Sequence, residues 1–243
     1  MTGAIGDPDL AKVRRLMWSK YDAEAIGSYY REHPWEVFER LGLLTRCVER
    51  VGVVIAGCVL QGQRGKTLIS SSGKAFADAL AEAGPTYSKF GQALSCRPDL
   101  VDEAVAGALQ ELQDRVPAFD NDIARQIIRE ELGAAAQELL DTMGRETVAA
   151  ATLGQVYRAK VGGNAVAVKV QRPGIMRGVA ADSFIVRWAA AVLELLRDPT
   201  SGDRLIKPAL VDGCDEFFSR LFEESDYQRE ASNLARFAAL IEP

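Results

Sequence analysis

The sequence predicts an α+β fold in which helices predominate and one short antiparallel sheet interrupts them. Apolar residues recur at spacings of three and four over much of residues 9–145, which is typical of helices packed on helices. Three short apolar segments follow, and a glycine-rich turn at residues 162–164 joins the second to the third, a pattern typical of a β-hairpin. The helical spacing returns after Pro173 and Gly174.

Helices are expected to fill the first half of the chain. The spacing predicts helical regions over residues 9–64 and 68–84, divided by a glycine-containing stretch. Gly84 and Pro85 then start another helix, because proline suits the first turn of a helix. Along that helix Lys89, Gln92 and Ser95 share a polar face, while the apolar residues Tyr87, Phe90 and Leu94 lie mostly on another.

Two further helices are predicted from their capping residues. Asp99 or Asp102 caps a helix that ends before Pro117, and Asp120 or Asp122 caps the next one. The second of these helices stops at a glycine, Gly133. We expect its core-facing side to consist of four apolar residues: Ile123, Ile127, Ile128 and Leu132.

Three strands are predicted over residues 148–151, 155–161 and 165–170, followed by helices over residues 176–196 and 211–240. Alternation along the third strand places three valines on one face and Ala167 with Lys169 on the other. On a central strand, this lysine can reach a nucleotide phosphate while the alanine leaves room for a flat base, as in the lysine strand of kinases. The alternative is an edge strand with a merely exposed lysine.

A loop of small residues precedes the hairpin. Gly154 fits the end of the glycine-rich loop that covers the phosphates in kinases, whereas Ala149 and Ala151 stand where its first two glycines would be. Alanine Cβ atoms restrict the backbone and limit its approach to a phosphate, so we expect an altered mode of nucleotide binding. The helix glutamate that a kinase lysine requires has a candidate in Glu230. Because 230 − 169 = 61 residues separate it from Lys169, a helical insertion is expected between them.

Composition and charge exclude several classes of protein. The chain has 243 residues, 48% of them hydrophobic, so it can bury a core, and its formal charge of −5 comes without the basic clusters that bind nucleic acid. The sequence has a single histidine, His33, which excludes a His-rich zinc site. His33 precedes a proline and is interpreted as a helix-end or surface residue. Four widely spaced cysteines without a CxxC pair indicate a reducing compartment.

Targeting and membrane signals are weak. The first 18 residues lack the pattern of a secretory signal or a transit peptide, so either the protein stays where it is made or its start is incomplete. The most apolar run, residues 51–60, has about half the length that a transmembrane helix needs. It is either a helix packed on a neighbouring helix or a peripheral membrane contact.

Four ordered motifs resemble those of the UbiB/aarF-domain atypical kinases. Lys89, Gly91, Gln92 and Ser95 are similar to the KxGQxxS signature of that family. Residues 149–154 resemble its alanine-rich nucleotide loop, residues 166–173 its lysine strand, and residues 224–226 its ExD motif, with Glu230 in the place of the helix glutamate. The resemblance covers about residues 21–237, and residues 21–26 are most like the cyanobacterial and plastid branch.

The resemblance implies two domains: a helical N-terminal extension over residues 1–117, and a partial kinase-like small lobe with a helical insertion over residues 118–243. It implies ATP as a cofactor, together with Mg²⁺ whose ligands belong to a large lobe that we expect to be absent here, so no catalytic residue is assigned. The implied nucleotide contacts are Lys169, Glu230, Ala149, Ala150, Ala151, Gly154 and Ala167. The implied cleft residues are Lys89, Gly91, Gln92, Ser95, Glu224 and Asp226.

In function, the resemblance implies the ATP-binding portion of an atypical kinase or ATPase that supports prenylquinone or isoprenoid-lipid metabolism. Its partners would be a nucleotide and prenyl lipids or quinone-biosynthesis proteins, at a plastid or cyanobacterial membrane. The alternative is a non-catalytic binding or regulatory module built on a kinase small lobe. A truncated enzyme would leave apolar side chains uncovered, and the residues expected to show this are Phe217, Phe218, Leu221 and Phe222.

Overall fold

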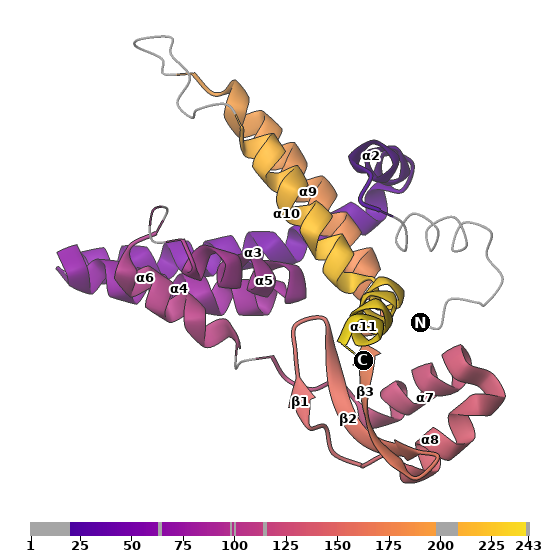
Figure 1. Cartoon of the computed structure of the whole chain (residues 1–243). Coiled ribbons are helices and arrows are strands. Elements are labelled where there is room, and N and C mark those ends of the chain that lie inside the picture. Colours follow the sequence, from indigo (N-terminus) through magenta and orange to yellow (C-terminus); the bar gives the residue numbers. More distant parts are fainter. Residues whose placement is uncertain are drawn as a thin grey trace. The chain divides into compact units, whose positions relative to one another are not determined.

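The computed structural model describes residues 20–62, 65–97, 99, 101–113, 116–197 and 209–241. Helices predominate and three strands form one antiparallel sheet, which confirms the predicted α+β class (Figure 1). The chain divides into two compact units, residues 43–175 and residues 1–42 with 176–243, and each is described by itself. The predicted division of the sequence at residue 117 is a different partition and stays a prediction.

Packed helices form one part of the 43–175 unit. Helix α5 (Pro85–Ser95) packs against α4 (Gly65–Ala83) and α6 (Glu103–Gln110), and it begins at the proline that the sequence indicated. Asp102 caps α6, because its carboxylate accepts a hydrogen bond from the Ala104 N–H at 2.9 Å. A 3-10 turn (Glu111–Gln113) follows α6. The buried residues of this bundle are Ala77, Leu80, Leu109 and Leu112.

Gly91 is the point of closest approach within this bundle. It is buried in α5, and a Cβ atom built on it would lie 2.5 Å from Cδ1 of Leu112 and 2.9 Å from Cδ1 of Leu80. These distances are shorter than carbon atoms tolerate, so the missing side chain allows α5 to lie directly on its neighbours.

The sheet forms the second part of this unit, with the strand order β1 (Ala149–Ala150), β2 (Gly154–Val161), β3 (Asn164–Gln171). Two glycines with positive φ, Gly162 at 57° and Gly163 at 80°, form the turn between β2 and β3. Positive φ at both positions is what a two-residue hairpin turn requires, and this confirms the predicted hairpin.

Helices α7 (Asn121–Leu132) and α8 (Ala136–Thr142) pack against the sheet (Figure 1). Asp120 caps α7 and Gly133 ends it at φ 55°, as predicted. The predicted core face is wrong for Ile123 and Leu132, which are exposed, because the buried side of α7 is centred on Ala124 and Ile128. The buried core between these helices and the sheet comprises Ala124, Ile128, Ala136, Leu140, Met143, Tyr157, Ala159 and Val170.

The other unit is entirely helical where the structure describes it. It contains α2 (Ala23–Glu32), the first residues of α3 (Pro34–Leu60), α9 (Ile175–Leu195), α10 (Leu210–Ser225) and α11 (Tyr227–Ile241). The region predicted to be helical over residues 9–64 contains α2 and α3, and α2 ends at His33, as its interpretation as a helix-end residue implied, because the residue before a proline avoids the helical conformation. Residues 9–19 of that region, and most of the polar stretch before α10, lie outside the described residues.

The helix predicted over residues 211–240 is also two helices, α10 and α11. Asp226 lies between them with φ −84° and ψ 86°, and its carboxylate accepts a hydrogen bond from the Arg229 N–H at 2.9 Å. An aspartate side chain favours capping positions because it bonds backbone N–H groups. Asp226 therefore ends one helix and starts the next, although the apolar spacing continues across it.

Buried polar contacts link the helices of this unit. Arg40 forms a bidentate ion pair with the fully buried Asp182, at 2.6 and 2.8 Å. The Tyr21 hydroxyl donates to Asp215 at 2.8 Å, and the Arg187 Nε donates to the same carboxylate at 3.0 Å. Burial and the hydrogen bond to Asp215 raise the pKa of Tyr21 far above its ordinary value.

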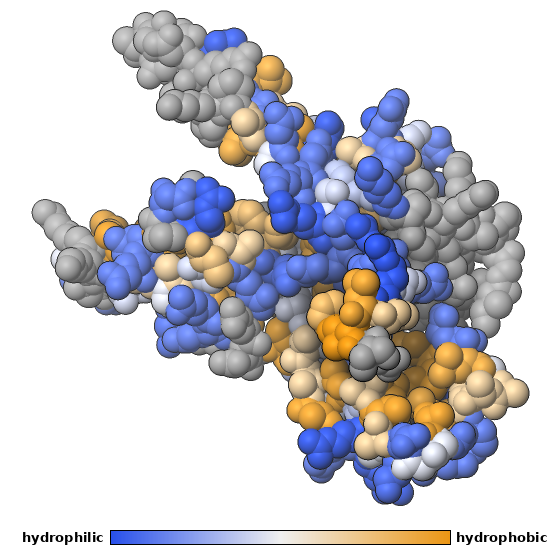
Figure 2. Space-filling model, in the orientation of Figure 1, coloured by the Kyte–Doolittle hydropathy of each residue, from blue (hydrophilic) through white to orange (hydrophobic). Residues whose placement is uncertain are grey.

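The apolar side chains that were expected to be uncovered in a truncated enzyme are not exposed. Phe218, Leu221 and Phe222 are buried and Phe217 is half-buried, because they face the packed side of α10, so that expectation is wrong for these residues. Exposed apolar side chains gather instead over α11 (Figure 2), and they belong to Leu234, Phe237, Leu240 and Ile241.

None of the described helices is both long enough and apolar enough to cross a membrane.

Substitution of Gly91 by alanine is expected to destabilise the protein by about 1–2 kcal/mol, because leucine side chains in a closed core must move to admit the new methyl group. The control is Gly107→Ala at an exposed position of α6, where no atom other than nearby backbone of the same helix lies within 4 Å of the new Cβ and helix propensity predicts a gain of about 0.5–1 kcal/mol. Urea unfolding of both variants measures the difference. Equal stabilities of the two variants would contradict the close approach of α5.

Candidate nucleotide-binding site

The exposed face of the sheet carries the predicted lysine in register with the alanine-rich loop. Val156 of β2 pairs with Lys169 of β3 on one side and with Ala149 of β1 on the other. Residues that are directly paired across strands share a face, and adjacent strands lie about 4.8 Å apart. Ala149, Val156 and Lys169 therefore form one row across the sheet, in which the two outer Cα atoms are about 10 Å apart.

The two faces of β3 are used as predicted. Val166, Val168 and Val170 pack toward the core beneath the sheet, while Ala167 and Lys169 are exposed on the opposite face. Of the two positions that the sequence left open for this strand, the edge position is the one observed, because within the described residues β3 pairs only with β2. The lysine is thus presented on an open face at one side of the sheet.

The loop between β1 and β2 is a tight turn. The Ala151 N–H donates to the Gly154 carbonyl at 2.7 Å, so the loop closes on itself. Thr152, Leu153 and Gly154 are buried, whereas Ala149 and Ala151 are exposed and Ala150 is half-buried. The alanines that stand in place of glycines are therefore at the surface of the turn.

Helix α5 contacts this loop through Gln92, whose Nε2 donates to the Thr152 hydroxyl at 3.3 Å. The polar face predicted for this helix is only partly present. Lys89 and Gln92 are half-buried, but Ser95 is buried and its hydroxyl donates to the Gln92 carbonyl at 2.7 Å. Gly91 serves close packing. The KxGQ helix and the alanine-rich loop are thus joined directly by a hydrogen bond between side chains.

The remaining predicted residues belong to the other unit. Glu224 is exposed near the end of α10, Asp226 caps α11, and Glu230 is exposed in the first turn of α11. The pairing of Lys169 with Glu230 joins the two units and stays a prediction. The same applies to the approach of Lys89 and Gln92 toward Glu224 and Asp226.

Two residues that sequence reasoning did not select support the loop from within the core. Gln155 is fully buried, and its side-chain amide binds both the N–H and the carbonyl of Phe119, at 2.9 and 3.1 Å. Arg172, which follows β3, donates to carbonyls of the loop and of Pro117. Strand alternation could have placed Val156 beside Lys169, but no spacing in the sequence indicates the partners of Gln155 or Arg172.

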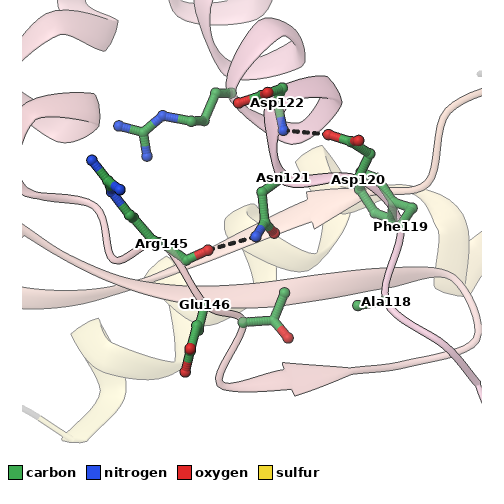
Figure 3. A pocket seen from close by; sticks show the side chains of 9 residues that line it. Ala118, Phe119, Asp120, Asn121, Asp122, Arg145 and Glu146 are labelled. Atoms are coloured by element: carbon green, nitrogen blue, oxygen red, sulfur yellow. Dashed lines mark hydrogen bonds between the residues drawn. The ribbon is translucent and has the colours of Figure 1, made fainter.

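A polar depression of about 950 Å³ lies apart from these residues, at the start of α7 (Figure 3). Its lining includes acidic and basic side chains close together, and the Asn121 amide donates to the Arg145 carbonyl at 2.5 Å across it. No residue of the predicted nucleotide site lines it. Its lining consists of Ala118, Phe119, Asp120, Asn121, Asp122, Arg125, Arg145, Glu146 and Thr147.

Among the described residues, no group of three or more His, Cys, Asp or Glu side chains is arranged to hold a metal ion. The exposed row with its lysine fits a phosphorylated nucleotide, but this part of the chain supplies no set of carboxylates for Mg²⁺, so no step is assigned to the metal.

A small antiparallel sheet that carries a lysine beside a loop of small residues is a feature of kinase-like small lobes. Residues 111–243 match the ABC1 atypical kinase-like domain. The chain therefore belongs to the ABC1 atypical kinase-like family, to which the UbiB and aarF-domain proteins also belong.

Similar proteins come from cyanobacteria, plants and other bacteria. An uncharacterized protein of Synechocystis sp. is 41% identical over 228 residues, which cover 91% of this chain and 32% of the relative. The chloroplastic Arabidopsis thaliana protein named ACTIVITY OF BC1 COMPLEX KINASE 1 is 38% identical over 250 residues, covering 97% and 34%. A probable protein kinase UbiB of Marinobacter nauticus is 40% identical over 159 residues, covering 65% and 28%. The chain thus spans about a third of the length of these relatives.

Proposed function

We propose that this chain is the ATP-binding part of an ABC1-type atypical kinase or ATPase. The observation that carries the proposal is the row of Ala149, Val156 and Lys169 on the exposed face of the sheet. In this row Val156 offers an apolar side chain to the base. On one side of it Lys169 offers a cation to a phosphate, and on the other side Ala149 begins the loop that would cover the phosphates. The whole protein is proposed to support prenylquinone or isoprenoid-lipid metabolism, as its family resemblance implies.

The chemistry assigned to this chain is binding and orientation. The Lys169 ammonium is a point charge on a flexible stem, which suits an α- or β-phosphate oxygen. Ala167 leaves space above the strand for a flat base, and the loop over residues 149–154 covers the phosphates. Glu230 is proposed to hold the lysine in position, with Lys89, Gln92, Glu224 and Asp226 as the polar lining of the cleft. The reacting groups and the Mg²⁺ ligands are assigned to another part of the protein.

The test is a titration of the purified chain with ATP and with adenosine. Lys169→Met is expected to raise the dissociation constant for ATP about tenfold, because one charge-assisted contact to phosphate is lost. Adenosine, which has no phosphate, should bind the variant as it binds the original chain. Isothermal titration calorimetry measures both constants.

The matched control for this titration is Lys74→Met, which removes an exposed lysine of α4 in the same unit. It should leave both constants unchanged. An equal affinity of Lys169→Met and the original chain for ATP would overturn the assignment of the lysine. Failure of the original chain to bind ATP at all would favour the binding-module alternative.

We also propose that helix α3 makes a peripheral contact with a lipid surface. The uncharged run over residues 51–60 is largely exposed, with Val53 at 72% and Leu60 at 88%. Exposed Arg46 precedes it on the same helix and can meet a lipid phosphate, whereas Arg50 is paired with Glu82. The relatives from Arabidopsis are chloroplastic and others are cyanobacterial, so a plastid or cyanobacterial membrane is the proposed location.

Binding to vesicles of phosphatidylcholine and phosphatidylglycerol tests this contact by co-sedimentation. Val53→Asp is expected to weaken binding about tenfold, since it removes the burial of one valine side chain and adds a charge. Val161→Asp, which changes an exposed valine in the hairpin of the same unit, is the control and should bind as the original chain does. Equal binding of the two variants would contradict a contact through α3.

A further inference from the structure

Arg172 binds carbonyl groups of the alanine-rich loop. Its Nε donates to the Thr152 carbonyl at 3.2 Å and to the Ala151 carbonyl at 3.4 Å, and its Nη2 donates to the Ala151 carbonyl at 3.3 Å. Its own backbone N–H donates to the Leu153 carbonyl at 3.0 Å. One residue thus holds three successive carbonyls of the loop.

The same guanidinium is anchored to the segment before α7. Its Nη2 donates to the Pro117 carbonyl at 2.5 Å, and its carbon atom Cζ lies 5.6 Å from the centre of the Phe119 ring. The Phe119 N–H donates to Oε1 of the buried Gln155 side chain, and Nε2 of that side chain donates to the Phe119 carbonyl. The position of Arg172 is therefore fixed by the core of the sheet, and the loop takes its position from Arg172.

The orientation of the carbonyls determines that of the neighbouring N–H groups. In a trans peptide the C=O and the following N–H point in opposite directions. Because the Ala151 and Thr152 carbonyls point at Arg172, the N–H groups of Thr152 and Leu153 point away from it. Neither of these two N–H groups donates a hydrogen bond to any residue that the structure describes.

Thr152 and Leu153 are only 7% and 8% exposed, and backbone N–H groups of such residues usually have an acceptor within the protein, whereas these two have none among the described residues. Successive N–H groups that converge in a turn form a concave site for an anion. The residues Ala149, Val156 and Lys169 mark the neighbouring face as the place where a nucleotide would lie.

We propose that Arg172 is a positioning residue that aims the N–H groups of Thr152 and Leu153 at a phosphate of the bound nucleotide. This inference rests on the proposed function, because the phosphate is that of ATP. Glycines allow such a loop to adopt a backbone conformation that presents its N–H groups. Alanines replace two of those glycines here, and the hydrogen bonds from Arg172 hold the loop in a conformation that still presents backbone donors. The guanidinium itself touches no phosphate and acts through the loop.

The experiment combines hydrogen exchange of the loop with nucleotide titration of the 243-residue chain. Arg172→Met should speed amide exchange in the segment 150–156 about tenfold, because the carbonyls are released. It should raise the dissociation constant for ATP about tenfold and leave that for adenosine unchanged. Arg172→Lys should not restore either property, since a compact ammonium group on a flexible stem lacks the rigid planar fork whose separate nitrogens bind the carbonyls of the loop and of Pro117. Arg129→Met, which changes an exposed side chain of α7, is the control and should behave as the original chain.

Three results would overturn the proposal: unchanged exchange of the loop in Arg172→Met, full recovery by Arg172→Lys, or an equal loss of affinity for ATP and adenosine. The last result would indicate a general loss of structure. If the original chain binds no ATP, the proposed function and the phosphate role fail together, while the exchange measurement still decides whether Arg172 holds the loop.

Discussion

Burial of the valine face of β3 against α7 and α8 determines which way every other side chain of that strand points. Because Val170 is buried and Val166 and Val168 pack on the same core, Ala167 and Lys169 are directed to the open face. A shift of the hairpin by one residue would bury the lysine and expose the valines, at a cost that the core makes prohibitive. The glycines of the turn fix the register, so packing and turn geometry together set the position of the lysine.

Polar contacts then connect this sheet to the segments around it. The Gln155 side chain binds the backbone before α7, Arg172 binds both that backbone and the loop, and Gln92 reaches the loop from α5. Each of these side chains satisfies buried or half-buried backbone and side-chain groups that would otherwise lack partners. The alanine-rich loop is thus held from two sides, by the core and by the KxGQ helix. Such a loop is restricted in conformation.

Much of the fold could be predicted from the sequence, because the alternation in β3, the glycine turn and the capping residues act over short distances. The hairpin, the cap at Asp120 and the open face with Lys169 were of this kind. The break at Asp226 and the burial of Ser95 were missed, since each depends on contacts that helical spacing does not encode. In the site, the motif residues could be identified by resemblance, but Arg172 could not. Its partners are backbone carbonyls, which every residue has, so no residue type in the sequence indicates these contacts.

The proposed nucleotide site is the open face of the sheet. Photolabelling of the chain with 8-azido-ATP, followed by mass spectrometry of its peptides, tests this site. Labels are expected within residues 149–171, and excess ATP should prevent them while excess adenosine should reduce them. Labels confined to residues 118–122 and 145–147, which line the polar depression at the start of α7, would contradict it.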